Sequence, residues 1–423
     1  MSVIVSKLQE CLSHIDVNQQ ISIAYSGGID STVLLQAASI VCQQSGHSLK
    51  AIHIDHQIHA DSQQWAQFCI DQCRKLDIHI DTIRVDIQQY GQYGLEGAAR
   101  EARYQAFEKT LSAEDVLLTA HHADDQIETV LLQLFRGAGI KGLAGCAKSR
   151  MVGSALLVRP LIEISRQEIE HYARQNQLHW CDDPSNTSLS HDRNYLRHEI
   201  MPLLHARWQG LRETIGRSSQ WQSESSDMLD CLARLDAAKA VDENNGLSIE
   251  ELTTLDNMRM KNVLRWWIRK SQCVVPSANV LDRVIKDAVL SRSDCEASIR
   301  WQDHEIRKYR GQLYLKKVNM AHDATLSYEW DLKHTLTIPS LDLTLTREQL
   351  EQFGVNLSNI EQLTVRFRRG GEVMRPRGRG CEKKLKTLFQ EQGVKPWVRD
   401  RIPLLFHKQL LIFVWGYWIG EGY

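Results

Sequence analysis

The segment from Ala24 to Thr32, AYSGGIDST, contains the residues whose types and spacing most directly suggest chemistry. Gly27 and Gly28 let the backbone approach an anion closely, and a helix beginning after them would point free N–H groups at that anion. The hydroxyls of Ser26 and Ser31 add further donors. The segment therefore predicts a phosphate-binding loop between a strand and a helix.

Asp30 is the unusual member of this loop, because a carboxylate beside phosphates is repulsive unless a divalent cation lies between them. We therefore expect Asp30 to bind Mg²⁺. The spacing is neither that of a Walker loop, GxxxxGK[ST], nor that of a GxGxxG dinucleotide loop. The alternative is an ordinary turn in which Asp30 only caps the following helix.

A second group of ionisable residues lies in segment 121–128, HHADDQIE. His121, Asp125 and Glu128 have the spacing that places side chains on one face of a helix. Acidic groups gathered after a strand suit a cationic substrate or Mg²⁺, and the HExxH pattern of zinc enzymes is not matched. The alternative is an amphipathic helix whose acids are only solvated.

These residues need elements that position them, and the first part of the chain alternates strand and helix patterns. Four apolar runs predict strands at residues 21–25, 49–54, 78–85 and 116–120. Such alternation predicts an α/β fold with a parallel, doubly wound sheet covered on both faces. Ligands of these sheets bind at the carboxyl ends of the strands, where the glycine loop is expected.

The remainder of the chain predicts two further domains. Residues 218–289 have an almost entirely helical pattern, and strand patterns follow at 306–317 and 335–346. We expect a catalytic domain at 1–215, a mainly helical substrate-binding domain at 216–350, and a small α+β domain at 351–423.

The third predicted domain contains a strongly basic run. Between Arg366 and Arg401 there are twelve Lys or Arg residues against four Asp or Glu residues, an excess of eight. Cations next to glycines suit the phosphates of structured RNA. The candidate RNA-binding residues are Arg369, Arg375, Arg377, Arg379, Lys383, Lys384 and Lys386. The last three are expected on a helix with a basic face, and the alternative is a charged face that only contacts water.

Composition restricts the class of protein. The 423 residues carry a formal net charge of −1 and are 43% hydrophobic and 24% charged, which is typical of a soluble globular protein. No run approaches the roughly 18 apolar residues of a membrane span, and a cytoplasmic protein is expected. The ten cysteines form no C-x-x-C pair, which argues against zinc ribbons and iron–sulfur sites.

The phosphate loop resembles that of the PP-loop pyrophosphatases, which adenylate a substrate and release pyrophosphate. Further motifs resemble those of the tRNA(Ile)-lysidine synthetases, at 53–56 (HIDH), 95–104, 119–129, 136–139, 182–186 (DDPSN), 192–194 and 369–397. One departure is Gln57, which stands where that pattern has glycine.

The resemblance implies ATP with Mg²⁺ on the loop, an isoleucine tRNA with a CAU anticodon, and free L-lysine as the second substrate. It implies catalytic roles for Asp30, Glu128 and Arg193, and lysine binding by Asp125 and Glu128. The implied ATP-binding residues are Ser26, Gly27, Gly28, Ile29, Asp30, Ser31, His53 and Arg100. From the residues alone, His53 could equally be a satisfied polar group at the sheet edge.

The implied reaction begins when the C2 oxygen of the wobble cytidine attacks the α-phosphate and pyrophosphate leaves. The lysine ε-amine then attacks C2, and AMP departs. One alternative is a tRNA thiolase with the same adenylation step, and another is a small-molecule amidating enzyme. A third is a tRNA-binding module whose nucleotide site has decayed. The sequence leaves open whether the protein forms a homodimer.

Overall fold

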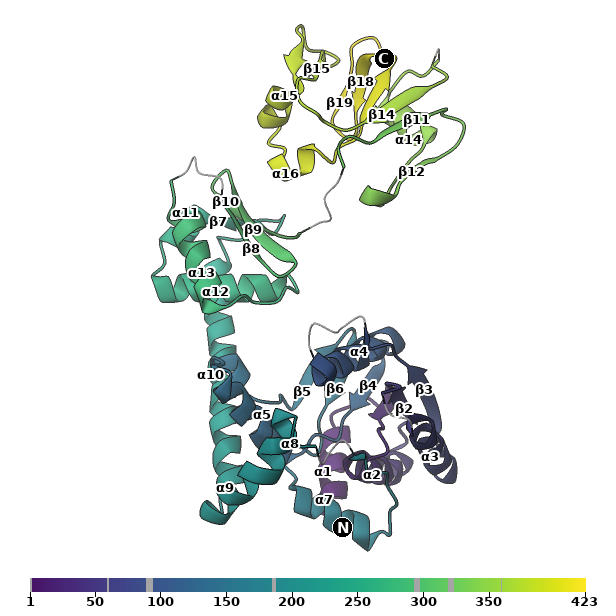
Figure 1. The fold of residues 1–423 in the computed structure, drawn as a ribbon, viewed down its shortest axis with the longest axis vertical. Coiled ribbons are helices and arrows are strands. Elements are labelled where there is room, and N and C mark those ends of the chain that lie inside the picture. Colours follow the sequence, from purple (N-terminus) through teal and green to yellow (C-terminus); the bar gives the residue numbers. More distant parts are fainter. Residues whose placement is uncertain are drawn as a thin grey trace. The chain divides into compact units, whose positions relative to one another are not determined.

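The computed structural model describes residues 2–58, 61–88, 94–184, 188–292, 297–318, 323–358 and 360–423, with the backbone alone at 94–96 (Figure 1). The chain divides into two compact units, Met1–Asp230 and Cys231–Tyr423. No described helix combines the length and the apolar character that crossing a membrane requires. The predicted domain boundaries near 215 and 350 remain predictions.

The first unit is built on a six-stranded sheet with the strand order β3-β2-β1-β4-β6-β5 (Figure 1). Its strands are β1 Gln20–Ala24, β2 Leu49–Asp55, β3 His79–Arg84, β4 Asp115–Leu118, β5 Ser149–Val152 and β6 Ala155–Val158. All neighbours pair in parallel except β5, which pairs antiparallel with β6. The predicted α/β class is confirmed, and β1 to β4 fall on the four predicted strand segments.

Helices cover both faces of this sheet. They are α1 Val3–Leu12, α2 Ile29–Ser45, α3 Ser62–Lys75, α4 Gly94–Thr110 and α7 Arg166–Gln175. One core joins the buried residues of α1, α2, α3 and α7 to Ile23 and Leu118 of the sheet. A second core on the other face joins Phe107 of α4 to Leu117 and Leu157. Neighbouring strand residues thus enter opposite cores, as the pleat of a sheet requires.

The rest of the first unit is helical and carries part of the candidate site. Its elements are α5 Ala123–Phe135, α6 Ile140–Leu143, α8 Asp192–Tyr195, a π-helical turn Leu196–Ile200, and α9 Met201–Arg207. Helix α10, Leu211–Ala237, begins in this unit and continues past its boundary. A small core of Ile127, Leu196 and Met201 fixes α5 against the π-helical turn and α9.

The second unit begins with a helical layer on a four-stranded antiparallel sheet of order β7-β10-β9-β8. The elements are α11 Ile249–Thr253, α12 Asn257–Lys270, α13 Ala278–Arg283, a π-helical turn Val284–Val289, β7 Leu247–Ser248, β8 Ser298–Trp301, β9 His304–Tyr309 and β10 Gln312–Lys317. Trp267 is fully buried at the centre of their shared core.

The C-terminal part of this unit is built around a five-stranded antiparallel sheet of order β11-β14-β17-β18-β19. Its strands are β11 Ser327–Trp330, β14 Leu363–Arg366, β17 Leu404–His407, β18 Leu410–Val414 and β19 Trp418–Ile419. Around it lie β12 Leu336–Ile338, β13 Leu343–Leu345, α14 Arg347–Phe353, β15 Val373–Met374, β16 Lys383–Lys384, α15 Leu385–Glu391 and α16 Pro396–Arg399. The expected small α+β region is present.

Candidate active site

The predicted phosphate loop connects β1 to α2 at the carboxyl end of the sheet. Gly27 has φ +85°, a left-handed conformation in which a side chain would also come within 3.0 Å of the Cys69 Sγ atom. Ser31 fixes the loop from inside, because its hydroxyl accepts from the Ser26 N–H (3.3 Å) and donates to the Gly28 carbonyl (3.0 Å). No side chain caps α2, whose N-cap is Gly28. This helix end is therefore available to an anion, as the sequence predicts.

Asp30 lies in the first turn of α2 and is held by a cation. Both of its oxygens accept from the Arg166 Nη1 atom, at 2.7 and 2.8 Å. The His122 Nε2 atom lies 3.8 Å from Asp30 Oδ1. Burial raises the pKa of the Asp30 carboxyl, although His122 and Arg166 oppose this effect. Asp30 is not the cap of α2, so the simplest alternative role for this residue is excluded.

Helix α5 carries the second group of acids, but it begins later than the sequence pattern suggests. His122 is its N-cap, and the His122 N–H donates to Asp125 Oδ2 at 3.1 Å. The prediction that His121 shares a helical face with Asp125 and Glu128 is wrong, because His121 precedes the cap and bonds the Thr119 hydroxyl (3.0 Å). The two acids do share a face, because they are three residues apart on the helix.

Two arginines of α8 and the π-helical turn grip this acid pair. Arg193 donates from Nε to Glu128 Oε2 (2.8 Å) and from Nη2 to Asp125 Oδ1 (2.9 Å). Arg197 donates from Nε to Glu128 Oε1 (2.6 Å) and from Nη2 to Glu128 Oε2 (2.9 Å) and Asp125 Oδ1 (3.3 Å). The Glu128 side chain is only 1% exposed, so its charge depends on these partners.

The pKa values of Asp125 and Arg193 reflect this arrangement. Burial alone would raise the pKa of Asp125, but the charges of His122 and Arg193 outweigh it and lower that pKa to about 2. Burial likewise disfavours the charge on Arg193, and Asp125 and Glu128 outweigh it and raise the Arg193 pKa. Asp125 and Arg193 therefore stabilise each other's charged forms.

Asp124 connects the two halves of the site. Its Oδ1 atom accepts from the Arg212 Nε atom of α10 (2.9 Å), and its Oδ2 atom accepts from the Arg166 backbone N–H (2.9 Å). Arg166 is the first residue of α7, so one residue contacts Asp30 through its side chain and Asp124 through its backbone. Four carboxylates of the site are thus each bonded to arginine.

His122 lies between these carboxylates. It is 3% exposed, and its Nε2 atom is 3.8 Å from Asp30 Oδ1 and 3.5 Å from Asp125 Oδ2. Its Nδ1 atom is 3.8 Å from Asp124 Oδ2 and has no hydrogen-bond partner within the described part of the chain. The imidazole therefore places the phosphate loop and the acid pair of α5 in one site.

His53 and Arg100, the two other residues predicted to contact the nucleotide, lie on β2 and α4. His53 is buried, and its Nδ1 atom bonds the Tyr25 carbonyl (3.0 Å) immediately before the phosphate loop. Burial lowers the His53 pKa, so the ring is neutral at pH 7. Arg100 is exposed on α4, over the Tyr104 ring. Burial lowers the pKa of His121 to about 3, and Arg100 contributes to this shift across the site.

Several residues of the site were missed by the sequence analysis. Arg166, Arg197 and Arg212 were not predicted, and His122 was not singled out within its motif. Arg197 could have been found, because it lies four residues after Arg193 and would share its helical face. Arg166 gives no local signal, since it is 136 positions from Asp30.

The motif at 182–186 lies partly outside the described residues, which include 182–184 but not Ser185 and Asn186. The Cys181 N–H donates to the Gly27 carbonyl (2.9 Å), so this segment begins beside the phosphate loop. The side chains of Leu95 and Glu96, in the motif at 95–104, are also outside the description.

The basic C-terminal run is partly neutralised by the chain itself. Arg379 and Lys383 both bond Glu391 at 2.6 Å, Arg375 pairs with Glu421, and Arg369 donates to the Thr325 carbonyl (2.5 Å). Arg377 contacts the Gly354 carbonyl (3.4 Å).

Lys384 and Lys386 are exposed, and no hydrogen bond or ion pair of either side chain occurs within the described ranges. The predicted basic helix is corrected, because α15 begins only at Leu385 and Lys383 and Lys384 form β16. Of the three lysines, only Lys386 lies on the helix.

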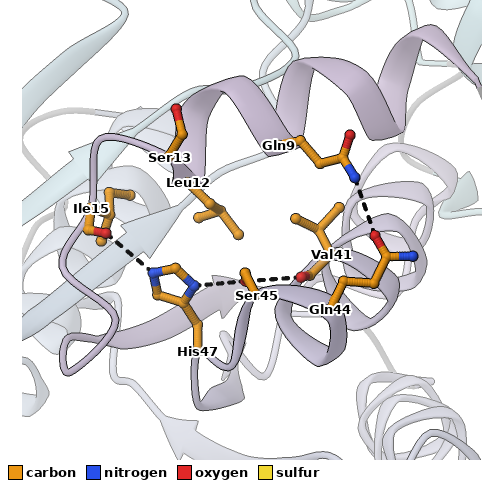
Figure 2. A pocket seen from close by; sticks show the side chains of 8 residues that line it. All are labelled: Gln9, Leu12, Ser13, Ile15, Val41, Gln44, Ser45 and His47. Carbon is orange, nitrogen blue, oxygen red and sulfur yellow. Dashed lines mark hydrogen bonds between the residues drawn. The ribbon is translucent and has the colours of Figure 1, made fainter.

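A pocket of 390 Å³ lies between α1 and α2, at the end of α2 farthest from the phosphate loop (Figure 2). Figure 2 shows that its polar groups bond one another: Gln9 donates to Gln44 (3.1 Å), and His47 contacts Ser45 (2.8 Å) and the Ile15 carbonyl (3.3 Å). Few polar groups are left for a ligand. The pocket does not extend the candidate site.

Comparison with protein families covers most of the chain. Residues 1–204 match the PP-loop domain, residues 247–314 the TilS substrate binding domain, and residues 363–423 the TilS substrate C-terminal domain. A tRNA(Ile)-lysidine synthase of Coxiella burnetii is 38% identical over 418 residues, covering 99% of this chain and 93% of the relative. The enzyme of that name from Legionella pneumophila (strain Paris) is 36% identical over 404 residues, covering 95% and 92%.

Among solved structures, a U34-tRNA thiolase from Methanococcus maripaludis resembles the chain with a TM-score of 0.45 and 19% identity. The match covers 52% of this chain and 78% of the thiolase. This likeness is too low to support a conclusion about function.

Proposed function

This chain belongs to the tRNA(Ile)-lysidine synthase family, ATP-using ligases with a PP-loop domain, and from this premise we propose a role for each part of its site. We propose that it joins free L-lysine to C2 of the wobble cytidine in an isoleucine tRNA with a CAU anticodon. ATP is converted to AMP and pyrophosphate in the process.

In the first step, the phosphate loop holds the triphosphate of ATP. The amides at the start of α2 and the Ser26 hydroxyl supply donors, Ser31 keeps the loop in shape through its bond to the Gly28 carbonyl, and the positive end of the helix favours the anion. His53 and Arg100 complete the proposed nucleotide contacts. The C2 oxygen of cytidine forms a bond to the α-phosphorus, and the bond to the β-phosphate oxygen breaks, which releases pyrophosphate.

Asp30 is the proposed protein ligand of Mg²⁺. The guanidinium of Arg166 on both its oxygens indicates that this position favours a cation, and carboxylate and hydroxyl oxygens are ligands that Mg²⁺ prefers. No cluster of three or more His, Cys, Asp or Glu side chains within the described ranges could hold a metal, so phosphate oxygens would complete its shell. When bound, Mg²⁺ neutralises charge that develops on the departing phosphates.

In the second step, the lysine ε-amine attacks C2, the bond from C2 to the AMP oxygen breaks, and one amine proton is lost. Asp125 and Glu128 are the proposed binding site of this amine. Both acids accept hydrogen bonds from arginine, which shows that they can hold a cationic nitrogen. We therefore propose that Glu128 holds the amine in the position from which it attacks.

The observation that carries this proposal is the position of His122 within 3.8 Å of Asp30 and 3.5 Å of Asp125. The adenylating loop and the amine-binding acids are then parts of one site, as a reaction in two consecutive steps needs. Sulfur transfer is not favoured, because burial raises the pKa of Cys69 and Cys181 next to the loop and the thiols stay protonated.

The test is to incubate the protein with ATP and tRNA and to supply either labelled lysine or a sulfur donor. We expect lysine incorporation, and mass spectrometry of the wobble nucleoside should show lysidine. Incorporation of sulfur without lysine would contradict the proposal. A second tRNA with an unrelated anticodon is the matched control and should remain unmodified.

A further inference from the structure

The acid pair that is proposed to receive lysine is already occupied by cations of the chain itself. Arg193 and Arg197 together make five hydrogen bonds to Asp125 and Glu128, all between 2.6 and 3.3 Å. The two negative charges are thus balanced by two positive charges. A third cation entering this cluster would find no net attraction and few free lone pairs.

One of the two arginines is better placed to leave. The Arg197 side chain is 37% exposed, whereas the Arg193 side chain is 23% exposed. Arg197 therefore loses fewer buried contacts when it moves into solvent. Arg197 also lies on the π-helical turn Leu196–Ile200. Such turns are rare and often occur at functional positions.

We propose that Arg197 is an internal counter-ion that closes the lysine site, and that free lysine enters by exchanging its ammonium group for this guanidinium. The inference rests on the proposed function, because it takes Asp125 and Glu128 as the lysine site. One cation leaves and one arrives, so the buried carboxylates are never left unpaired. Arg193 stays and keeps its hydrogen bonds to both acids.

The phosphate loop provides the destination for the displaced guanidinium. Arg197 donates to Asp125 Oδ1 (3.3 Å), and the His122 Nε2 atom lies 3.5 Å from Asp125 Oδ2 and 3.8 Å from Asp30 Oδ1, so only the His122 ring separates this acid from the phosphate loop. Phosphate oxygens of a bound nucleotide would offer Arg197 a bidentate partner. Nucleotide binding therefore opens the lysine site, and the two substrates bind in a preferred order.

The first test uses the unmodified full-length protein without tRNA. Equilibrium dialysis measures the binding of labelled L-lysine with and without the Mg²⁺ complex of α,β-methylene-ATP, which cannot be cleaved at the α,β bond. We expect the nucleotide analogue to increase lysine affinity roughly tenfold, within the usual range of coupling between sites. By reciprocity, lysine should increase affinity for the analogue by the same factor. Equal lysine affinity in both conditions would overturn the proposal.

The second test uses variants in the same dialysis experiment. Arg197→Gln removes the counter-ion, and we expect it to bind lysine without nucleotide about as tightly as the wild type does with nucleotide. Arg197→Lys keeps a tethered cation and should restore nucleotide dependence, which a merely structural role would not explain. Arg74→Gln is the control, because it removes a guanidinium bonded to Asp71 on α3, outside the candidate site, and should leave lysine affinity unchanged.

The outcomes separate this inference from the proposed function. If Arg197→Gln still requires nucleotide for lysine binding, the counter-ion proposal is wrong, whereas the lysine site stands. If neither the wild type nor the variants bind lysine under any condition, the proposed function fails together with the inference.

Discussion

At the scale of single residues, each of the three acids proposed to bind a cationic ligand is already bonded to an arginine of the chain. These acids are Asp30, Asp125 and Glu128. Mg²⁺ would replace Arg166 at Asp30, and the lysine ammonium would replace one arginine at the acid pair. An unpaired carboxylate at these positions, which are buried at Glu128 and partly buried at Asp30 and Asp125, would be costly. The internal ion pairs therefore stabilise the ionised acids in the absence of ligands.

Asp30 gives a prediction about the adenylation step. Asp30→Asn keeps the shape of the side chain but removes the negative charge that Mg²⁺ needs. We expect pyrophosphate release with ATP and tRNA to fall at least about a hundredfold. Affinity for tRNA should stay near that of the wild type, and filter binding measures it. A large loss of tRNA affinity would mean that Asp30 acts on the fold and not on the nucleotide.

Asp125 gives a prediction about acid stability. Its pKa is about 2 in the folded protein and 3.8 in the ordinary state, so folding favours its ionised form. A lowered pKa contributes stability that is complete above about pH 4 and lost as the pH falls toward 2. The contribution is on the order of 2 kcal/mol.

Thermal melting at pH 7, 4 and 3 tests this dependence. Asp125→Asn should melt earlier than the wild type at pH 7, and the difference should shrink as the pH falls from 4 to 3. Asp71→Asn, which changes a half-exposed acid paired with Arg74 on α3, serves as a control and should show no such convergence. A difference that is constant with pH would contradict the prediction.

At the scale of elements, the two glycines of the phosphate loop differ in backbone conformation. Gly27 is left-handed, whereas Gly28 has a φ that any residue can adopt. Gly27→Ala forces a side chain into a φ of +85° and to within 3.0 Å of Cys69 Sγ. We expect a loss of about 1–2 kcal/mol in stability and weaker ATP binding.

Gly28→Ala is the matched control. Gly28 has a φ of −73°, and a new Cβ there would be 3.6 Å from the nearest atom, the Ser26 Oγ. Its melting temperature should stay near that of the wild type. Calorimetry with ATP and thermal melting distinguish the two variants, and equal destabilisation by both would show that the backbone conformation is not what requires Gly27.

At the scale of the whole molecule, a chain with net charge −1 must bind a polyanion through part of its surface. The basic run at 366–401 has the required excess, but several of its cations are engaged by Glu391 and Glu421. Lys384 and Lys386 remain exposed, and we propose that they contact RNA phosphates directly.

Replacing both lysines by glutamine tests this assignment. We expect weaker tRNA binding and a salt dependence whose log–log slope falls by about one per lost phosphate contact. Lys408→Gln changes an exposed lysine of the same unit outside the basic run and should leave the slope unchanged. An unchanged slope in the double variant would exclude these lysines from the RNA interface.

Much of the fold follows from local pattern. Apolar runs between helical segments predicted β1 to β4, and the two glycines after β1 predicted the phosphate loop. Such features depend on neighbours in sequence, because strand formation and backbone freedom are set over a few residues. The start of α5 was misplaced because an N-cap residue and a first-turn residue carry similar polar side chains.

The sequence by itself determined the α/β sheet, the anion-binding loop and the acids that follow β4. Only the tertiary structure decided which arginine meets which acid. Arg166 and Asp30 are 136 positions apart, and Arg193 is 65 positions from Glu128. A guanidinium can bond any carboxylate that the fold brings near. Its partner is therefore decided by how the helices pack, for example by the contact of Ile127 with Leu196 and Met201, and cannot be read from the residue type alone.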